Sequence, residues 1–364
     1  MAIDVVIGGQ RGDEGKGNFC AWLGLRGGIN KEGFREDYSI AVRSASPQAG
    51  HSIYINDKRF GIAHLPCAVV NKNLRLLLGG ASSISPKKIF YGGKELRPHT
   101  GEVIELEPEI PSFDLTPERL GIDYRAKLVL DEHGEKEKHD ERLMKLGSIG
   151  SGVNMAKIDL IYKEAKFIKE DSELSRFSAD TVKEMNLALS QGKHILFETD
   201  HGIELCQHFG GYFPYNTART INTSAYLGEV GLPPQSVRDV YLVIKPYITA
   251  VAKDAPFKER ITDKETLDEL LEVGGESGSI SGRIRKVGKF DEEGFEHSIM
   301  LSGATKICIS HLDLSEHAWN TMGFSGEGEF FKKVRELSNK TFQKPKVALL
   351  CYGKCVNNVI DVDY

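Results

Sequence analysis

Short apolar runs alternate with amphipathic segments along most of the chain. Such runs predict buried strands, and they lie at residues 3–8, 38–43, 74–78, 126–130, 194–198, 239–245, 306–309 and 346–351. Helical spacing predicts helices at 155–167, at 179–190 with Ser178 or Asp180 as the cap, at 264–272 and at 327–338. This alternation predicts an α/β fold in which helices flank a central, mainly parallel β-sheet.

Two segments interrupt the alternation. The stretch HSIYINDKRFGI at 51–62 alternates about Asn56 and Asp57, so it predicts a hairpin. The charged stretch EHGEKEKHDER at 132–142 has mixed signs and is expected to be a solvated loop. Because no repeat and no Pro/Ser linker divides the sequence, we expect residues 1–364 to form a single domain with hairpin and loop insertions.

Composition and charge narrow the function. The chain has 47 basic and 52 acidic residues and a formal charge of -5, which argues against a broad basic surface for nucleic acid polymers. Any nucleotide that it binds is therefore expected to be small. No apolar run approaches the roughly 18 residues of a membrane helix, and the start MAIDVVIGGQ lacks the features of a signal peptide. We expect a cytoplasmic protein that contacts neither membrane nor nucleic acid polymers.

The six cysteines are expected to be reduced, buried thiols, because a chain of this size does not need disulfides. They are Cys20, Cys67, Cys206, Cys308, Cys351 and Cys355. The last two lie in CYGKC, which lacks the second pair of ligands that a structural metal site requires. Packing is therefore the favoured role for these thiols.

The glycine-rich stretch GGQRGDEGKGN at 8–18 follows the first apolar run. Backbone amides around Lys16 at the start of a helix suit an anion such as phosphate. The loop lacks the first glycine of the standard phosphate-loop pattern and has Gly17 in place of Ser or Thr. Asp13 and Glu14 would repel a phosphate, so they require a cation or a proton donor nearby.

The segment GDEGKG after a strand and a glycine pair resembles the signature of adenylosuccinate synthetases. These ligases join L-aspartate to a 6-oxopurine nucleotide at the expense of a nucleoside triphosphate, usually GTP. Six similar landmarks follow in the family's order: PQAGHS at 47–52, GIDYRAKLVL at 121–130 with LGSIGSG at 146–152, FETDHGIELCQHFGGYFPYNTAR at 197–219, GSISGRIRKVGKFD at 278–291, ISHLD at 309–313 and CYGKC at 351–355. The resemblance covers nearly the whole chain, is closest to compact archaeal and phage-encoded members, and implies a P-loop-related fold.

The resemblance also implies roles for individual residues. The catalytic residues would be Asp13, His51 and Lys16, and the ligands of Mg²⁺ would include Asp13 and Gly50. The triphosphate would contact Gly12, Glu14, Gly15, Lys16, Gly17, Ser52, Asp313 and Gly353. The substrate nucleotide would contact Gln48, Ser148, Ile149, Lys163, His201 and Thr217. L-Aspartate would contact Val251, Ser281, Arg283 and Arg285.

The implied chemistry replaces O6 of the purine, which is a poor leaving group until it is phosphorylated. Asp13 would accept the N1 proton of the purine, O6 would become phosphorylated, and His51 and Lys16 would offset charge on the phosphoryl group. The amine of aspartate would then displace phosphate at C6. Arg283 and Arg285 are two residues apart, so in an extended segment they face the same side and can hold both carboxylates of aspartate.

The sequence departs from the family where the substrate nucleotide should lie. Arg11 replaces a tryptophan, Gln48 an asparagine, Ile149 a threonine, Lys163 an arginine and His201 a glutamine. Members that use IMP keep these positions closely, so the joint change favours another purine. We therefore expect dGMP, the substrate of the phage branch that makes the succinylated precursor of diaminopurine DNA, with IMP as the alternative.

Several points stay open at this level. Many phage members carry Ser at the position of Asp13, although a carboxylate there can accept both N1–H and N2–H of guanine. Asp313 resembles the family's guanine reader, but His311 replaces its lysine, so GTP and ATP both remain candidates. A homodimer, in which Lys163 reaches the partner's nucleotide, and a host cytoplasm for a phage-encoded protein follow from resemblance alone.

Three other functions are alternatives to the ligase. A nucleotide-binding relative without ligase activity would tolerate the substitutions. A GTPase switch is disfavoured because Gly17 replaces its magnesium-binding Ser or Thr. A metal cluster of Glu198, Asp200, His201 and His208 matches no known ligand spacing and is disfavoured as well.

Overall fold

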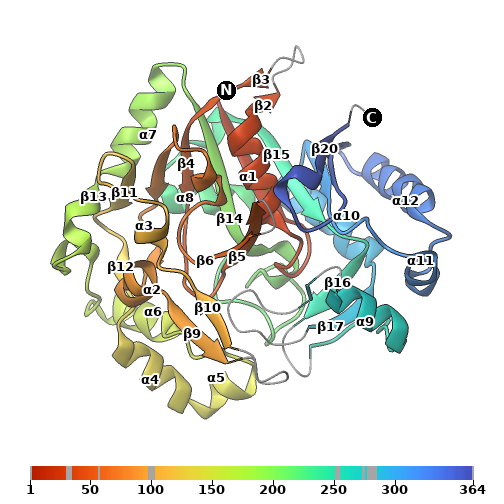
Figure 1. The fold of residues 1–364 in the computed structure, drawn as a ribbon, viewed down its shortest axis with the longest axis horizontal. Coiled ribbons are helices and arrows are strands. Elements are labelled where there is room, and N and C mark those ends of the chain that lie inside the picture. The colour runs from red at the N-terminus through yellow and green to blue at the C-terminus, as the bar shows by residue number, and fades with distance from the viewer. Residues whose placement is uncertain are drawn as a thin grey trace.

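A ten-stranded sheet organises the structure, a computed structural model that describes residues 2–29, 35–55, 58–96, 103–250, 255–272, 275–276 and 285–362 (Figure 1). The strands, in spatial order, are β13 (Ser178–Ala179), β11 (Leu120–Asp123), β7 (Arg75–Leu78), β4 (Tyr38–Arg43), β14 (His194–Gly202), β1 (Ile3–Gly8), β15 (Val237–Ile244), β18 (Lys306–Ile309), β19 (Lys346–Cys351) and β20 (Val359–Asp361). Adjacent strands are parallel except for β19 and β20. The predicted α/β class and mainly parallel sheet are confirmed.

Helices cover both faces of the sheet, because successive side chains of a buried strand point to opposite sides. Val6 packs on one face, while Val5 and Ile7 pack on the other. The first face carries α1 (Lys16–Arg26), η1 (Cys67–Val70), α2 (Pro86–Tyr91) and α3 (Glu109–Ser112). The second carries α7 (Thr181–Ser190), α8 (Thr223–Val230), α10 (Glu292–Ser302), α11 (Glu316–Met322) and α12 (Glu327–Lys340).

Further elements lie outside the central sheet. Small sheets pair β2 (Gly28–Ile29) with β3 (Arg35–Glu36), β5 (His51–Ile55) with β6 (Lys58–Ile62), β8 (Ser83–Ile84) with β12 (Lys127–Leu128), β9 (Gly93–Leu96) with β10 (Val103–Leu106), and β16 (Tyr247–Ala250) with β17 (Lys286–Lys289). The remaining α-helices are α4 (Asp131–His139), α5 (Glu141–Lys145), α6 (Val153–Tyr162) and α9 (Lys264–Glu272). Short 3-10 turns are η2 (Ile168–Glu170), η3 (Leu174–Phe177), η4 (Ile203–Leu205), η5 (Pro234–Ser236) and η6 (Val356–Asn358).

The element predictions are confirmed at most positions. Strands β5 and β6 form the expected antiparallel hairpin, in which Ile55 pairs with Lys58 while residues 56–57 lie outside the described ranges. Of the two candidate caps of α7, Asp180 accepts the hydrogen bond from the amide of Lys183. The helix expected over 155–167 ends earlier, at Tyr162, because Lys163 adopts a left-handed conformation with φ 67°.

The solvated loop expected over residues 132–142 is wrong, because this stretch forms most of α4 and the start of α5. Its charges follow helical rules: acids begin α4, bases end it, and Glu135 pairs with Lys138 at 2.9 Å. His133 and Glu137, four residues apart, anchor the buried side of α4. A mixed-charge sequence conceals this amphipathic helix because its buried positions are themselves polar.

The strand expected over 126–130 is also mostly wrong. Only Lys127 and Leu128 form a strand, and they pair with β8 rather than joining the central sheet. Ala126, Leu128 and Val129 are buried all the same. The single-domain organisation of residues 1–364 stays a prediction. None of the helices in the described ranges is long and apolar enough to span a membrane.

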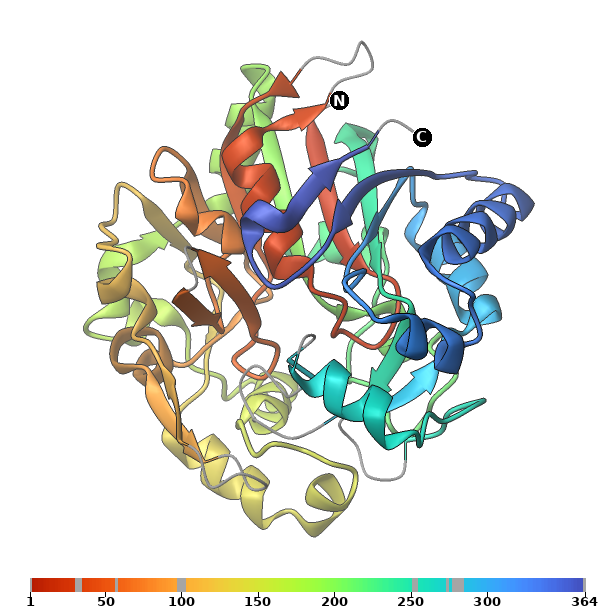
Figure 2. The same ribbon diagram turned by 45° about the vertical axis from the view of Figure 1, so that its right-hand side comes forward.

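The carboxyl ends of the central strands carry the segments that build the site. Strand β1 lies between β14 and β15, so the loop after it stands at the middle of the sheet. The α4–α6 region and the α9, β16 and β17 region lie on opposite sides below these strand ends (Figures 1 and 2). Ligands of open α/β sheets bind at this edge, which is where the candidate residues gather.

Candidate active site

Glu14 explains how a glycine-rich loop accommodates an acid. Its carboxylate is fully buried and accepts hydrogen bonds from the amides of Gln10 and Gly12, each at 2.8 Å. It also pairs with the ammonium of Lys16 at 2.9 Å. Burial alone would raise the pKa of Glu14, but the charge and hydrogen bond of Lys16 and the backbone amides lower it. Glu14 therefore holds the loop from inside.

Two glycines make room for this buried carboxylate. A Cβ atom on Gly8 would lie 2.5 Å from Oε2 of Glu14, and one on Gly202 would lie 2.4 Å from the carbonyl of Gln10. Lys16 is itself 2 % exposed, and its ammonium also donates to the carbonyl of Gly12 at 3.3 Å. In the structure the ammonium of Lys16 is directed into the loop. Its contact with a transferring phosphoryl group therefore stays a prediction.

Asp13 stands on the other side of the same loop and lines a cavity. Its Oδ1 atom pairs with Arg285 at 2.9 Å, and its Oδ2 atom accepts a hydrogen bond from Thr249 at 3.4 Å. Burial raises the pKa of Asp13, and the charges of Arg285 and Lys245 offset only part of that effect. A carboxylate with a raised pKa at a cavity wall is suited to accept a proton.

Arg285 links Asp13 to a buried ionic cluster. Its Nη1 atom donates to Glu276 at 2.8 Å, and Glu276 also accepts hydrogen bonds from Lys245 and Tyr247, each at 2.6 Å. Burial would raise the pKa of Glu276, but the charges of Lys245 and Arg285 lower it to about 2. The Nε atom of Arg285 is buried without a partner among the described residues.

His51 begins β5 and lines the same cavity as Asp13. Its Nδ1 atom makes a very short hydrogen bond with Glu198 of β14. Burial would raise the pKa of Glu198, but its contacts with His51 and Arg43 lower it to about 2, so the carboxylate is ionised and Nδ1 carries a proton. Burial and the charge of Arg43 lower the pKa of His51, so the ring is mostly neutral. Because Nδ1 is engaged by Glu198, Nε2 is the nitrogen left for a ligand in the cavity.

Arg43, the last residue of β4, fixes the loop that leads to His51. Its guanidinium is fully buried, donates from Nε to Asp200 at 2.8 Å and from Nη1 to the carbonyl of Leu65 at 2.9 Å, and makes a very short bond to the carbonyl of Ala49. Ala49 precedes Gly50, the predicted metal ligand. The ends of β4 and β14 thus position both Gly50 and His51.

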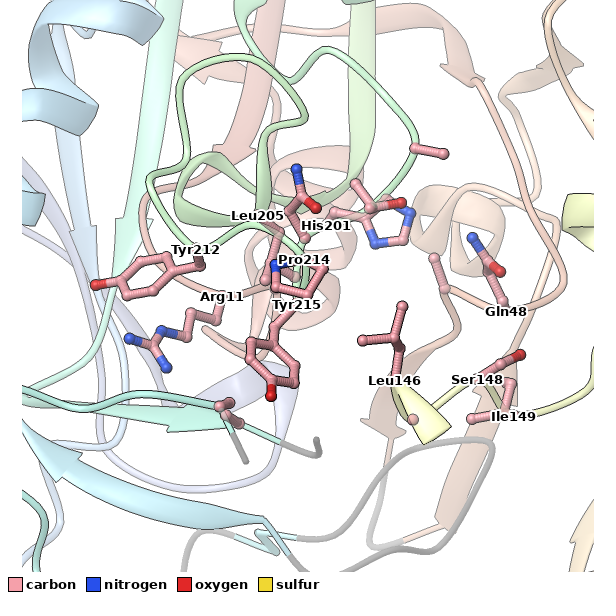
Figure 3. Close-up of a pocket in the computed structure, with 18 of the residues that line it drawn as sticks. Arg11, Gln48, Leu146, Ser148, Ile149, His201, Leu205, Tyr212, Pro214 and Tyr215 are labelled. Carbon is pink, nitrogen blue, oxygen red and sulfur yellow. The ribbon is translucent and has the colours of Figure 1, made fainter. Parts of the chain in front are cut away.

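The cavity has a volume of about 530 Å³, within the usual range for small-molecule sites. Most of its wall comes from residues 11–13, 48–51, 146–149 and 212–218, with further contributions from His201 and Arg285. Arg11 and Tyr212 lie at one end, Gln48, Ser148 and Ile149 lie at the other, and His201 lies between them (Figure 3). The structure therefore brings together residues from distant parts of the chain.

His201 stands where the family pattern has a glutamine, and it is the last residue but one of β14. It has a left-handed backbone with φ 59°, which is uncommon for a residue other than glycine. Burial and the charges of Arg219 and Lys157 lower its pKa well below the usual value, so the ring is neutral at pH 7. Thr217 also lines the cavity, and its amide donates to the carbonyl of Leu205 at 3.0 Å.

Ser148 and Ile149 line the cavity, and their contact with a nucleotide stays a prediction. The serine hydroxyl already has a partner. It donates to Glu137 at 2.5 Å, and Glu137 also accepts hydrogen bonds from the amide and side chain of Asn154. Glu137 therefore occupies the start of α6. Gln48 lies nearby and accepts a hydrogen bond of 3.5 Å from Ser151.

The residues predicted to contact the triphosphate lie around the start of α1. A Cβ atom on Gly15 would lie 3.5 Å from His311 and Ser310, and one on Gly17 would lie 2.8 Å from the carbonyl of Ser52. The loop of Asp313 adjoins that of Gly353, because the amide of Leu312 donates to the carbonyl of Cys351 at 3.3 Å. The Asp313 residue is exposed as a whole, but the loss of water around its carboxyl group raises its pKa. Neither Asp313 nor Gly353 lines the cavity.

Of the residues predicted to contact the substrate nucleotide or L-aspartate, four are not placed at the cavity by the described structure. Lys163 is exposed at the end of α6 and does not line it, so its reach to a partner subunit stays a prediction. Val251, Ser281 and Arg283 lie outside the described residues. The shared orientation of Arg283 and Arg285 is therefore also a prediction.

Sequence reasoning missed the residues that support the site. Glu198 and Arg43 are the last residues of the predicted runs 194–198 and 38–43. A charged residue at the end of such a run is the signal that could have identified them. Glu276 had no such signal, because it lies in the glycine-rich sequence GGESGS at 274–279, outside every predicted strand and helix.

The disfavoured metal cluster does not assemble in the described structure. Asp200 is paired with Arg43, and His208 is exposed. A different group, His51, Cys67 and Glu198, lies close together. Burial raises the pKa of Cys67 well above its usual value, which opposes the thiolate that a metal needs. All six cysteines are free thiols, five of them buried and Cys355 half-buried.

Comparisons with known proteins show the family of this chain. The family model of adenylosuccinate synthetase matches residues 5–170 and 155–322. The adenylosuccinate synthetase of Thermococcus onnurineus is 32% identical over 99% of this chain and 98% of its own length. That of Methanocaldococcus jannaschii is 30% identical over 100% of this chain and 97% of its own length.

Two solved structures share the fold. The fully ligated adenylosuccinate synthetase from Plasmodium falciparum has a TM-score of 0.78 at 17% identity and is covered along 100% of both chains. The succinoaminodeoxyadenylate synthetase of cyanophage S-2L, bound to dGMP and to dATP as an energy donor, has a TM-score of 0.76 at 20% identity, with 100% of this chain and 96% of that chain covered. The chain belongs to the adenylosuccinate synthetase family, a class of GTP-dependent ligases.

Proposed function

We propose that the protein joins L-aspartate to C6 of dGMP and forms the succinylated precursor of a 2-aminoadenine nucleotide. The observation that carries this proposal is the location of the departures from the family pattern. Four of the five departures, at Arg11, Gln48, Ile149 and His201, line the cavity that also contains Asp13 and His51, whereas the fifth, Lys163, does not (Figure 3). Changes that gather in the substrate cavity indicate a changed substrate rather than loss of function at random positions.

Asp13 is the proposed base for the purine. Its carboxylate faces the cavity, and its raised pKa makes it a better proton acceptor than an exposed aspartate. Guanine presents N1–H and N2–H side by side, and the two oxygens of one carboxylate can accept both. Removing the N1 proton pushes electron density onto O6, which then accepts the phosphoryl group.

His51 is the proposed hydrogen-bond donor to the phosphoryl group. In the free enzyme its ring is mostly neutral, with the proton on the nitrogen that faces Glu198. An arriving phosphoryl group favours the protonated ring, whose Nε2–H can then donate to it. Glu198 stabilises that cation and holds the ring in place. The aspartate amine, oriented by Arg285, then displaces phosphate at C6.

The chemistry of the donors fits a magnesium ion. The Asp13 carboxylate and the Gly50 carbonyl both border the cavity, and hard oxygen ligands of this kind suit Mg²⁺ together with phosphate oxygens and water. When bound, Mg²⁺ would gather the triphosphate and offset its charge. Arg285 occupies one oxygen of Asp13 in the described structure, so that ion pair would loosen when the substrates bind.

IMP remains the second candidate substrate. The archaeal relatives at 30–32% identity over nearly the whole chain are named adenylosuccinate synthetases, which favours IMP. The cyanophage enzyme bound to dGMP favours the other purine and, through its dATP, a donor other than GTP. A homodimer is proposed on family grounds alone.

Phosphate release tests the proposal. Purified protein is incubated with L-aspartate, Mg²⁺ and GTP, ATP or dATP, and with either dGMP or IMP. We expect release that requires aspartate and is faster with dGMP, and that is lost in Asp13→Ala. Turnover of IMP alone would contradict the choice of purine. Release without aspartate or purine would instead indicate a GTPase, and no release at all would indicate a non-catalytic relative.

A further inference from the structure

Three cationic side chains lie close to one another outside the end of the cavity where α6 begins, and none of them is a lining residue. Lys157 lies on α6, one turn beyond the cavity residue Asn154, and its Nζ atom donates to the carbonyl of the cavity residue Ala218 at 2.8 Å. Lys127 lies on β12 and donates to the carbonyl of Ala81 at 3.0 Å. Arg219 directly follows Ala218.

The carboxylates of Glu229 and Asp200, which lie nearby, already interact with Arg219. Arg219 pairs closely with Glu229 and lies 3.5 Å from Asp200, which is also held by Arg43. Neither Lys127 nor Lys157 forms an ion pair within the described part of the chain. Both ammonium groups use backbone carbonyls as partners, and each has further N–H donors to offer.

The charges of this cluster repel one another. Burial, followed by the charge of Arg219, lowers the pKa of Lys157 to about 8, although Glu229, Asp200 and Glu137 act in the opposite direction. Burial, followed by the charges of Lys157 and Arg219, lowers the pKa of Lys127 to about 8. A bound anion would relieve this repulsion, and among the described residues neither lysine has a carboxylate partner of its own.

The start of α6 does not supply an anion site of its own. Glu137 accepts the amide and side chain of Asn154 and the hydroxyl of Ser148. These are the donors that a phosphate at a helix start would otherwise use. A phosphate at this end of the cavity must therefore find its positive charge in the lysines.

We propose that Lys157, supported by Lys127 and Arg219, binds the phosphate monoester of the substrate from within the same chain. This inference rests on the proposed function, in which the substrate is a nucleoside 5′-monophosphate. A lysine ammonium is a compact charge that suits a phosphate dianion without requiring planar geometry. Lys163, six residues further along and exposed, is then not needed for the charge at this end.

The test compares a nucleotide with its own nucleoside. Binding of dGMP, IMP, deoxyguanosine and inosine is measured by calorimetry for the full-length protein and for Lys157→Gln, Lys157→Arg and Lys166→Gln. Lys166 is an exposed lysine just beyond α6, so its variant changes the net charge equally. Melting temperatures confirm that each variant is folded.

We expect Lys157→Gln to weaken binding of the monophosphate about 10- to 100-fold, as lost charge-assisted hydrogen bonds do, and to leave nucleoside binding unchanged. Lys157→Arg should restore part of the loss, and Lys166→Gln should resemble the wild type. Equal weakening of nucleotide and nucleoside, or no weakening of either, would overturn the inference. A Lys157-dependent preference for monophosphates in a protein without ligase turnover would uphold the inference while the proposed function fails. Absence of nucleotide binding would refute both.

Discussion

The carboxylate of Glu14 lies 2.9 Å from the ammonium of Lys16, and both side chains are buried within the loop that presents Asp13. The two adjacent acids of the loop, Asp13 and Glu14, therefore have different roles. Glu14 binds backbone amides and holds the loop, while Asp13 faces the cavity. A buried pair contributes most clearly when one partner is removed, because the other charge is then left without compensation.

Removing the charge of Glu14 should therefore destabilise the protein. Glu14→Gln keeps an oxygen for the amides of the loop but leaves the Lys16 ammonium unpaired, and we expect a loss of about 3–5 kcal/mol in the free energy of unfolding. The double variant Glu14→Gln, Lys16→Met should be less destabilised than the single variant. Urea unfolding measures both, and a double variant that is the less stable of the two would refute the role of the pair.

Gly202 should not tolerate a side chain. A Cβ atom there would lie 2.4 Å from the carbonyl of Gln10 and 2.6 Å from the amide of Gly12, so Gly202→Ala must displace the loop. We expect a loss of more than about 2 kcal/mol in stability together with loss of turnover. The matched control is Gly228→Ala in α8, where no atom lies within 4 Å and helix propensity predicts a gain of about 0.5–1 kcal/mol. Equal effects of the two substitutions would contradict this account.

Glu198 should act through His51. Glu198→Gln removes the carboxylate that orients the ring and stabilises its protonated form, so we expect kcat/KM to fall by at least about tenfold. The same substitution made in a His51→Ala background should have almost no further effect on turnover. Steady-state phosphate release measures all four proteins. Additive losses would show that Glu198 has a role independent of the histidine.

Glu204 should make stability depend on pH. It pairs with Arg11 at 3.0 Å, yet burial raises its pKa from 4.5 to about 7 despite that charge. Between these two pH values the folded state retains a proton that the unfolded state releases, so stability falls as pH rises through this window. The full difference corresponds to about 3 kcal/mol.

Glu204→Gln should remove this dependence. Relative to the wild type, the variant should gain up to about 3 kcal/mol in unfolding free energy between pH 4.5 and 8, whatever constant loss it also suffers. Denaturant unfolding at both pH values gives that difference. The exposed Glu132→Gln serves as the control and should show no such change. A constant offset for Glu204→Gln across the range would contradict the raised pKa.

Much of the fold follows from periodicity, because buried parallel strands are short apolar runs. Strand β1 at Ile3–Gly8 and strand β19 at Lys346–Cys351 coincide with the predicted runs. Helix α4 leaves no hydrophobic pattern because its buried residues, His133 and Glu137, are polar, and α5 has no buried residues at all. A polar side chain that is buried beside another polar group leaves no trace in a hydrophobic pattern.

The site was predictable to a smaller extent. Order along the chain identified Asp13, His51 and His201, and the structure places all three at one cavity. The partners that set their chemistry, Glu198 for His51 and Arg285 for Asp13, depend on distances between strands that no local pattern contains. The sequence also assigned Ser148 to the substrate nucleotide, and no local pattern indicated that its hydroxyl donates to Glu137.

A competition between the two purines tests the central claim most directly. Equal concentrations of dGMP and IMP are incubated with L-aspartate, Mg²⁺, a nucleoside triphosphate and limiting enzyme, and the two succinylated products are separated by mass spectrometry. Their initial ratio equals the ratio of the two kcat/KM values. We expect the product of dGMP to predominate. Predominance of the product of IMP would contradict it.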